Sequence, residues 1–238
     1  MSAIIETKRI TDILKYINNT TLVIFDVDNT LIDTVQNFGG TAWAYNVAHK
    51  LLKKGIEPTK AVKQSYTIYT EVKKFVQFKP VEPETPGLIR QLREKNIQAM
   101  VLTMRALQMA KSTVQDLRSA DIDFSKQPIH HETVTLESMA GYAEGILYSG
   151  PMLSKGECLT SFLDTISYKP EYIIFVDDSK QQVENVHTTL NERGIKNHCI
   201  RYGATDEREA SLDHEQANIE LRDAIGEEQY NRIFQKLL

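Results

Sequence analysis

Two aspartates, Asp26 and Asp28, directly follow a short apolar run and are the strongest candidates in this sequence for catalytic residues. The run, residues 22–25, is typical of a buried strand, and the acidic, Asn-containing segment behind it is where the backbone leaves a sheet. A carboxylate can attack phosphorus and form an aspartyl-phosphate, while a second one two residues on can donate and accept protons. We therefore predict that Asp26 is a nucleophile and that Asp28 is a general acid and base. The alternative is a turn whose carboxylates only cap backbone N–H groups.

Four more polar residues occupy similar places along the chain. Thr103 ends a second apolar run, Asp177 and Asp178 follow a third one, and Lys155 stands at the predicted start of a helix. In a parallel sheet the carboxyl ends of the strands share one edge, so residues far apart in sequence can converge on a single cleft there. For each of them the alternative is a local role, such as capping the next helix.

The combination of residue types predicts phosphoryl transfer assisted by a divalent cation. A hard cation with oxygen ligands, most simply Mg²⁺, holds a carboxylate near an anionic phosphoryl group. The Thr103 hydroxyl and the Lys155 ammonium would bind the equatorial phosphoryl oxygens, where the transition state carries its charge. Asp178 would act on the metal through a water molecule or would hold Lys155. The predicted metal ligands are Asp26, Asp28, Asp177 and Asp178.

This ordered set resembles that of the haloacid dehalogenase superfamily, whose members carry Asp-x-Asp-x-Thr after the first strand, Ser or Thr after the second, Lys at a helix start and paired acids after the fourth. The resemblance covers residues 20–202. It implies a phosphatase or a phosphotransferase, because dehalogenases lack the acid found at Asp28. Arg105 completes a Thr-x-Arg like that of some acid phosphatases, which makes it a candidate contact for phosphate or substrate. The matching positions are Asp26, Asp28, Thr30, Thr103, Lys155, Asp177 and Asp178.

Repeated strand and helix patterns predict an α/β protein with a doubly wound parallel sheet, like a Rossmann fold. We expect a core in residues 1–33 and 80–238 and a small helical cap in residues 34–79.

Helical spacing of apolar residues marks several segments outside the predicted sheet. It predicts an amphipathic helix over residues 2–17, two cap helices over residues 35–54 and 59–78, and a charged helix from Asp213 onward. Ser154 and the residues behind it fit a capping box at the start of a further helix.

Composition excludes several classes of protein. The net charge of -4 argues against general nucleic-acid binding. No apolar run approaches the roughly 18 residues that a membrane helix needs, and the start of the chain lacks the pattern of a secretion signal, so we expect a cytoplasmic protein without a membrane span. Cys158 and Cys199 show neither metal-ligand spacing nor a disulfide framework and are predicted to be reduced and buried.

The predicted cap is rich in lysine. Residues 50–79 contain eight lysines but only two acids, Glu57 and Glu71. Such a run is usually a solvated face. The alternative is a positive cover that attracts a phosphorylated substrate, either a small molecule or a macromolecule.

Taken together, these residues predict a Mg²⁺-dependent phosphohydrolase that acts on a phosphomonoester through an aspartyl-phosphate. One alternative is a catalytically idle protein that uses this scaffold to bind a phosphorylated ligand or partner. Another is a phosphotransferase or mutase, which needs the same residues and differs in what accepts the phosphoryl group.

Overall fold

The computed structural model describes residues 2–235, and within them the chain forms two compact units. The core unit contains the residues up to Ile32 together with Pro80–Thr205. The helical unit contains Asp33–Lys79 together with the described residues from Asp206 onward. The predicted division assigned all residues after 80 to the core, whereas the segment from Asp206 onward packs with residues 33–79 instead.

An eight-stranded sheet lies at the centre of the core unit, in the order β1-β10-β9-β2-β5-β8-β7-β6. All neighbouring strands are parallel except for the pairs that involve β7, which are antiparallel. This arrangement confirms the predicted α/β class with a mostly parallel sheet. The strands are β1 (Ala3–Thr7), β2 (Thr21–Phe25), β5 (Gln98–Thr103), β6 (Val134–Thr135), β7 (Gly141–Ala143), β8 (Ile146–Tyr148), β9 (Tyr172–Asp177) and β10 (Lys196–Tyr202).

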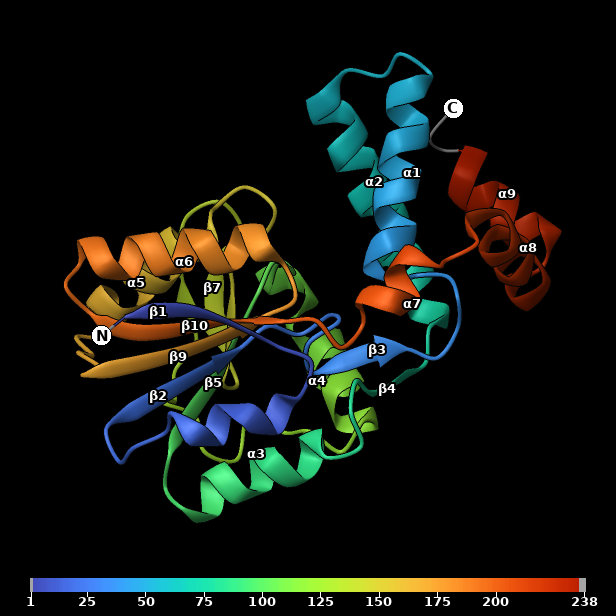
Figure 1. The fold of residues 1–238 in the computed structure, drawn as a ribbon. Coiled ribbons are helices and arrows are strands. Elements are labelled where there is room, and N and C mark those ends of the chain that lie inside the picture. The colour runs from blue at the N-terminus through green and yellow to red at the C-terminus, as the bar shows by residue number, and fades with distance from the viewer. Residues whose placement is uncertain (1, 236–238) are drawn as a thin grey trace. The chain divides into compact units, whose positions relative to one another are not determined.

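Helices cover both faces of this sheet, as its buried strands require. Figure 1 shows α5 and α6 on one face and α3 on the other. Leu22 and Ile24 of β2 belong to the apolar cluster under α5 and α6, which also contains Leu159 and Val186 from these two helices. The helices of the core unit are η1 (Ile10–Lys15), α3 (Thr85–Glu94), η3 (Leu107–Met109), α4 (Ala110–Ser119), α5 (Lys155–Thr165) and α6 (Lys180–Glu192).

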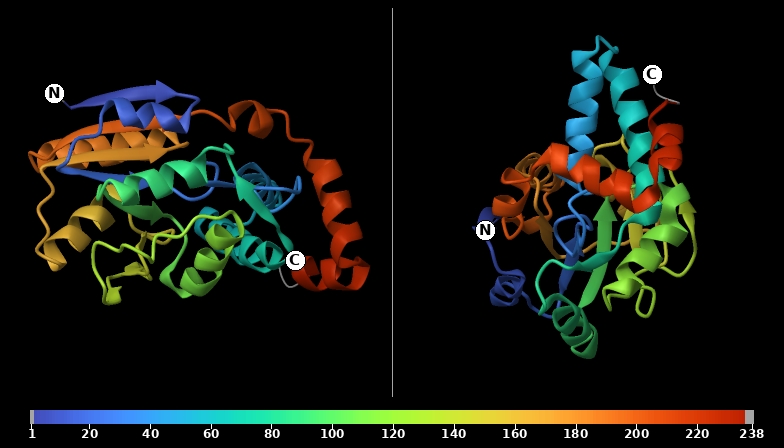
Figure 2. Two further views of the ribbon diagram at one scale, coloured as in Figure 1. Left: turned by 90° about the horizontal axis from the view of Figure 1, so that it is seen from below. Right: turned by 90° about the vertical axis from the view of Figure 1, so that its right-hand side faces the viewer.

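The helical unit has an apolar core of its own. In this core Trp43 and Val47 from α1 meet Leu221 from α8 and Ile233 from α9. Helices α1 and α2 pack side by side, as the right-hand view of Figure 2 shows. The elements are α1 (Thr41–Lys53), α2 (Pro58–Val72), η2 (Lys73–Phe75), α7 (Asp206–Ala210), α8 (His214–Ile225) and α9 (Glu227–Gln235), and the short strands β3 (Ile32–Thr34) and β4 (Phe78–Pro80) pair with each other.

Two further predictions about helices need correction. Residues 2–17 form the strand β1 and the short 3-10 helix η1, because the first residues pair in parallel with β10 and complete the edge of the sheet. The charged tail is interrupted at Gly226, whose φ of 79° suits glycine and separates α8 from α9. The cap helices are also shorter than predicted, since α1 begins at Thr41 and α2 ends at Val72.

Both cysteines are free and buried, as predicted from their spacing. Within the described residues, no helix has both the length and the apolar character needed to cross a bilayer.

Candidate active site

The loop behind β2 turns back on itself and directs its acids to the carboxyl edge of the sheet. The amide of Asp26 still donates to the carbonyl of Val176 on β9 at 2.9 Å, so Asp26 is fixed by the sheet. The carbonyl of Val27 then accepts from the amides of Leu31 and Ile32, both at 3.0 Å. Asn29 lies within this turn at φ 63°, a left-handed conformation that Asn tolerates better than most residues.

Lys155 joins two of the predicted acids from different strands. Its Nζ donates to Oδ1 of Asp26 at 2.6 Å and to Oδ2 of Asp177 at 2.5 Å, and all three side chains are buried. Lys155 is the first residue of α5, and Ser154 caps this helix, since its hydroxyl oxygen accepts from the amide of Glu157. The other half of the predicted capping box differs, because the Glu157 carboxylate accepts from the Ser154 hydroxyl at 2.6 Å. The cap therefore fixes where α5 begins and where the ammonium lies.

Asp178 is held by the loop behind β2. Its amide donates to Oγ1 of Thr30 at 3.1 Å, and its Oδ2 accepts from the side-chain amide of Asn29 at 3.2 Å. Among the described residues Lys155 does not hydrogen-bond to Asp178, so the predicted role of holding Lys155 belongs to Asp177. Asp177 also accepts from the amide of Ser179, and this bond fixes its second oxygen.

Asp26, Asp177 and Asp178 fit a metal site. Each offers a carboxylate oxygen, and these oxygens all lie within 4.8 Å of one another. A donor set made only of carboxylates suits a hard cation such as Mg²⁺. Asp28, the fourth predicted ligand, is not in this group of oxygens within the described part of the chain.

The electrostatics of the cluster favour a cation. Burial raises the pKa of Asp26 to about 7, a change that Lys155 opposes and the charge of Asp177 reinforces. Burial, with the charges of Asp177 and Asp26, raises the pKa of Asp178 to about 8. Burial by itself lowers the pKa of Lys155, but the adjacent carboxylates outweigh burial and raise it. A single ammonium therefore pairs with two of three crowded carboxylates, and a bound cation would relieve their mutual repulsion.

Asp28 and Arg105 form a second cluster beside the first. Nε and Nη2 of Arg105 donate to the two oxygens of Asp28, both at 2.9 Å. Nη1 of the same guanidinium donates to Oδ2 of Asp116 on α4 at 2.7 Å. Thr103 ends β5 as predicted, and its hydroxyl oxygen accepts from the amide of Arg105 at 3.2 Å.

Two residues of these clusters were not among the predicted site residues. Asn29 lies within the Asp-x-Asp-x-Thr segment, and its tolerance of a left-handed turn is a sequence signal that could have identified it. Asp116 lies within a helix where acidic residues are ordinary, so its approach to Arg105 depends on tertiary structure that the sequence pattern does not reveal.

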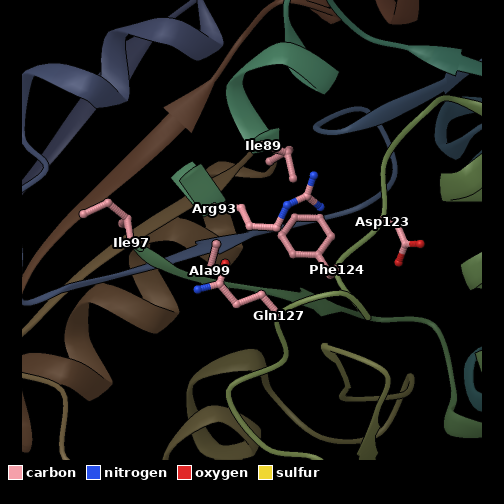
Figure 3. A pocket seen from close by; sticks show the side chains of 7 residues that line it. All are labelled: Ile89, Arg93, Ile97, Ala99, Asp123, Phe124 and Gln127. Atoms are coloured by element: carbon pink, nitrogen blue, oxygen red, sulfur yellow. The ribbon is translucent and has the colours of Figure 1, made fainter. Parts of the chain in front are cut away.

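A separate hollow lies away from these residues (Figure 3). Ile97 and Ala99, at the amino end of β5, contribute to its wall, whereas Thr103 lies at the carboxyl end of that strand. None of the predicted site residues lines it. Its lining consists of Ile89, Arg93, Ile97, Ala99, Asp123, Phe124 and Gln127.

Comparison with protein families gives one match that spans most of the chain. Residues 6–226 match the model of a family described as "Protein of unknown function (DUF2608)". The chain belongs to this family. Its similarity to curated proteins includes a "Putative outer membrane protein" of Chlamydia pneumoniae, which is 25% identical over 79% of this chain and 73% of the relative. A protein with the same description from Chlamydia muridarum is 24% identical over 81% of this chain and 72% of its own length. One from Chlamydia trachomatis is 23% identical over 77% of this chain and 69% of its own length.

Similarity to solved structures is weaker. A haloacid dehalogenase-like hydrolase from Streptococcus pneumoniae has a TM-score of 0.46 at 16% identity, over 74% of this chain and 82% of its own. A protein described as "putative beta-phosphoglucomutase" from Thermotoga maritima has a TM-score of 0.40 at 15% identity, over 81% of this chain and all of its own.

Proposed function

We propose that this protein is a Mg²⁺-dependent phosphohydrolase of the haloacid dehalogenase type that acts on a phosphomonoester through an aspartyl-phosphate on Asp26. The observation that carries this proposal is the meeting of Asp26, Asp177 and Asp178 from two strand ends around the ammonium of Lys155. The proposal also rests on the ordered set of residues that resembles that superfamily.

Each side chain has a role that its surroundings allow. Oδ1 of Asp26 accepts from Lys155, while its Oδ2 accepts no hydrogen bond from the described residues and is the oxygen we assign to attack on phosphorus. Lys155 and the Thr103 hydroxyl would bind the phosphoryl oxygens. Asp28 would protonate the leaving oxygen and then accept a proton from water. Mg²⁺, held by Asp26, Asp177 and Asp178, would neutralise charge on the phosphoryl group when bound.

The proposed substrate is a phosphorylated compound, either a small molecule or a macromolecule. A cytoplasmic location is part of the proposal and comes from the sequence prediction alone. The chlamydial relatives, by contrast, have the description of outer membrane proteins.

The test measures phosphate release from an aryl phosphate with Mg²⁺, after chelation and in the Asp26→Asn variant. We expect chelation to abolish turnover reversibly and Asp26→Asn to lower kcat on the order of 10³-fold or more. Asp223→Asn, on α8 of the helical unit, is the matched control and should keep wild-type activity. Undiminished turnover in Asp26→Asn or in chelator would refute the mechanism.

A measurement without turnover tests the metal separately. A cation that binds the folded protein alone raises its stability, by about 2.7 kcal/mol at a hundred times its Kd. We expect Mg²⁺ to raise the Tm of the wild type. The Tm of Asp178→Asn should be the same with and without Mg²⁺. Tight binding of a phosphorylated ligand without any release of phosphate would instead favour the idle binding protein.

A further inference from the structure

Arg105 is a buried cation that connects two aspartates from different elements. Only 2% of its side chain is exposed. It pairs with both oxygens of Asp28, in the loop behind β2, and with one oxygen of Asp116, on α4. A bidentate arginine–carboxylate pair fixes the plane of both groups as well as the distance between them.

The backbone of Arg105 is also fixed on both sides. Its amide donates to Oγ1 of Thr103 at 3.2 Å, and its carbonyl accepts from the amide of Gly150 at 3.2 Å. The position of the guanidinium is therefore set by the core unit. An arginine held in this way would have to break charge-assisted hydrogen bonds in order to reach a phosphoryl oxygen.

We propose that Arg105 is a positioning residue, held by Asp116, that fixes the carboxylate of Asp28 in the active site, and that it is not a contact for substrate. The Asp28 side chain keeps 24% of its surface exposed while both its oxygens accept from Arg105, so it can meet a substrate in a fixed orientation. The guanidinium favours the ionised carboxylate, the form that takes a proton from the attacking water, and the acid formed in that step is the one that protonates the leaving oxygen of the next substrate. This inference rests on the proposed function for the role of Asp28. On this inference Asp116 affects turnover indirectly, because it holds the guanidinium that positions Asp28.

The first test separates turnover from binding, with an aryl phosphate as substrate. We expect Asp116→Asn to lower kcat about tenfold with KM within twofold, because a displaced acid weakens catalysis more than binding. Asp116→Glu, which keeps the carboxylate, should recover part of kcat. Asp121→Asn is the matched control, since it removes an acid that pairs with Arg90 at 2.6 Å on the surface, and should keep wild-type kinetics.

Inhibition by inorganic phosphate distinguishes a positioning residue from a substrate contact. We expect the inhibition constant of Asp116→Asn and of Arg105→Lys to stay within twofold of that of the wild type. An unchanged kcat in Asp116→Asn would overturn the inference. It would also be overturned if, in both Asp116→Asn and Arg105→Lys, KM and the phosphate inhibition constant rose above the wild-type values by the same factor.

The second test needs no turnover and uses the Nε–H resonance of Arg105 in NMR spectra, assigned through its loss in Arg105→Lys. We expect this proton to exchange slowly with water, to exchange faster in Asp116→Asn, and to keep its chemical shift when Mg²⁺ and inorganic phosphate are added. A shift on adding phosphate, or exchange unaffected by Asp116→Asn, would overturn the inference. If the wild type had no phosphatase activity, the proposed function would be contradicted. The Nε–H resonance would still show whether Arg105 is held by Asp116 and stays away from phosphate.

Discussion

Asn29 combines an unusual backbone conformation with a contact to the acidic cluster. Its φ of 63° is costly for most side chains, and its amide nitrogen donates to Asp178. Replacing it with Gly or with Ala removes the same hydrogen bond, but only Gly adopts this φ without strain.

We therefore predict that Asn29→Ala is less stable than Asn29→Gly by about 1 kcal/mol. Urea unfolding followed by circular dichroism measures the difference in the free energy of unfolding. Equal stability of the two variants would show that the left-handed conformation at Asn29 contributes nothing.

Lys155 is the cation that lets Asp26 and Asp177 lie buried side by side. Removing one partner of a buried ion pair costs about 3–5 kcal/mol, since it leaves charge without compensation. We predict that Lys155→Met lowers the free energy of unfolding in urea by about this amount, and that Mg²⁺ restores part of the loss.

Lys180→Met is the matched control, because Lys180 is exposed and faces Glu184 at 3.9 Å on the surface of α6. Exposed pairs contribute little, so this variant should change stability by less than about 1 kcal/mol. A loss no larger in Lys155→Met than in Lys180→Met would contradict the ion-pair role.

At the scale of elements, α5 and α6 approach closely at Gly156, the residue after Lys155. A Cβ built at Gly156 would lie 2.3 Å from Oγ1 and 2.8 Å from Cβ of Thr189 on α6. We predict that Gly156→Ala lowers the free energy of unfolding by about 1–3 kcal/mol, because a well-packed contact would have to open. Gly87→Ala is the control: Gly87 lies in α3 with nothing within 4 Å of its Cβ position, so alanine should be neutral or stabilising there. Equal stability of the two variants would contradict the close contact.

The elements also show what the sequence can and cannot predict. The apolar runs of β2, β5 and β9 were predictable because each is largely buried on both faces and is bounded at its carboxyl end by a polar residue, Asp26 after β2, Thr103 in β5 and Asp177 in β9. The strand β1 was not, because its isoleucines are only partly buried or exposed and its pairing with β10 depends on a segment almost 200 residues away. The approach of Asp26, Lys155 and Asp177 to one another was predictable from their places at strand ends and at a helix start. The approach of Asp116 to Arg105 was not, because it depends on how α4 packs.

At the scale of the whole molecule, the helical unit is built from two segments far apart in sequence, and it contains the single tryptophan, Trp43. Trp43 is 1% exposed and shares its cluster with Leu221 of α8. We predict that Leu221→Ala lowers the stability reported by tryptophan fluorescence by about 2–5 kcal/mol. Ile219→Ala, on the exposed side of the same helix, should leave it nearly unchanged, and equal effects of the two would contradict the shared core.

This assembly from distant segments has a consequence for biosynthesis. Helices α1 and α2 are translated roughly 150 residues before α8 and α9. At roughly 5–20 residues per second, they wait on the order of ten seconds for the helices that cover them. Throughout that interval the nascent chain presents Phe38, Trp43 and Val47 without their final neighbours, so this apolar surface is open to association with other chains until synthesis is complete.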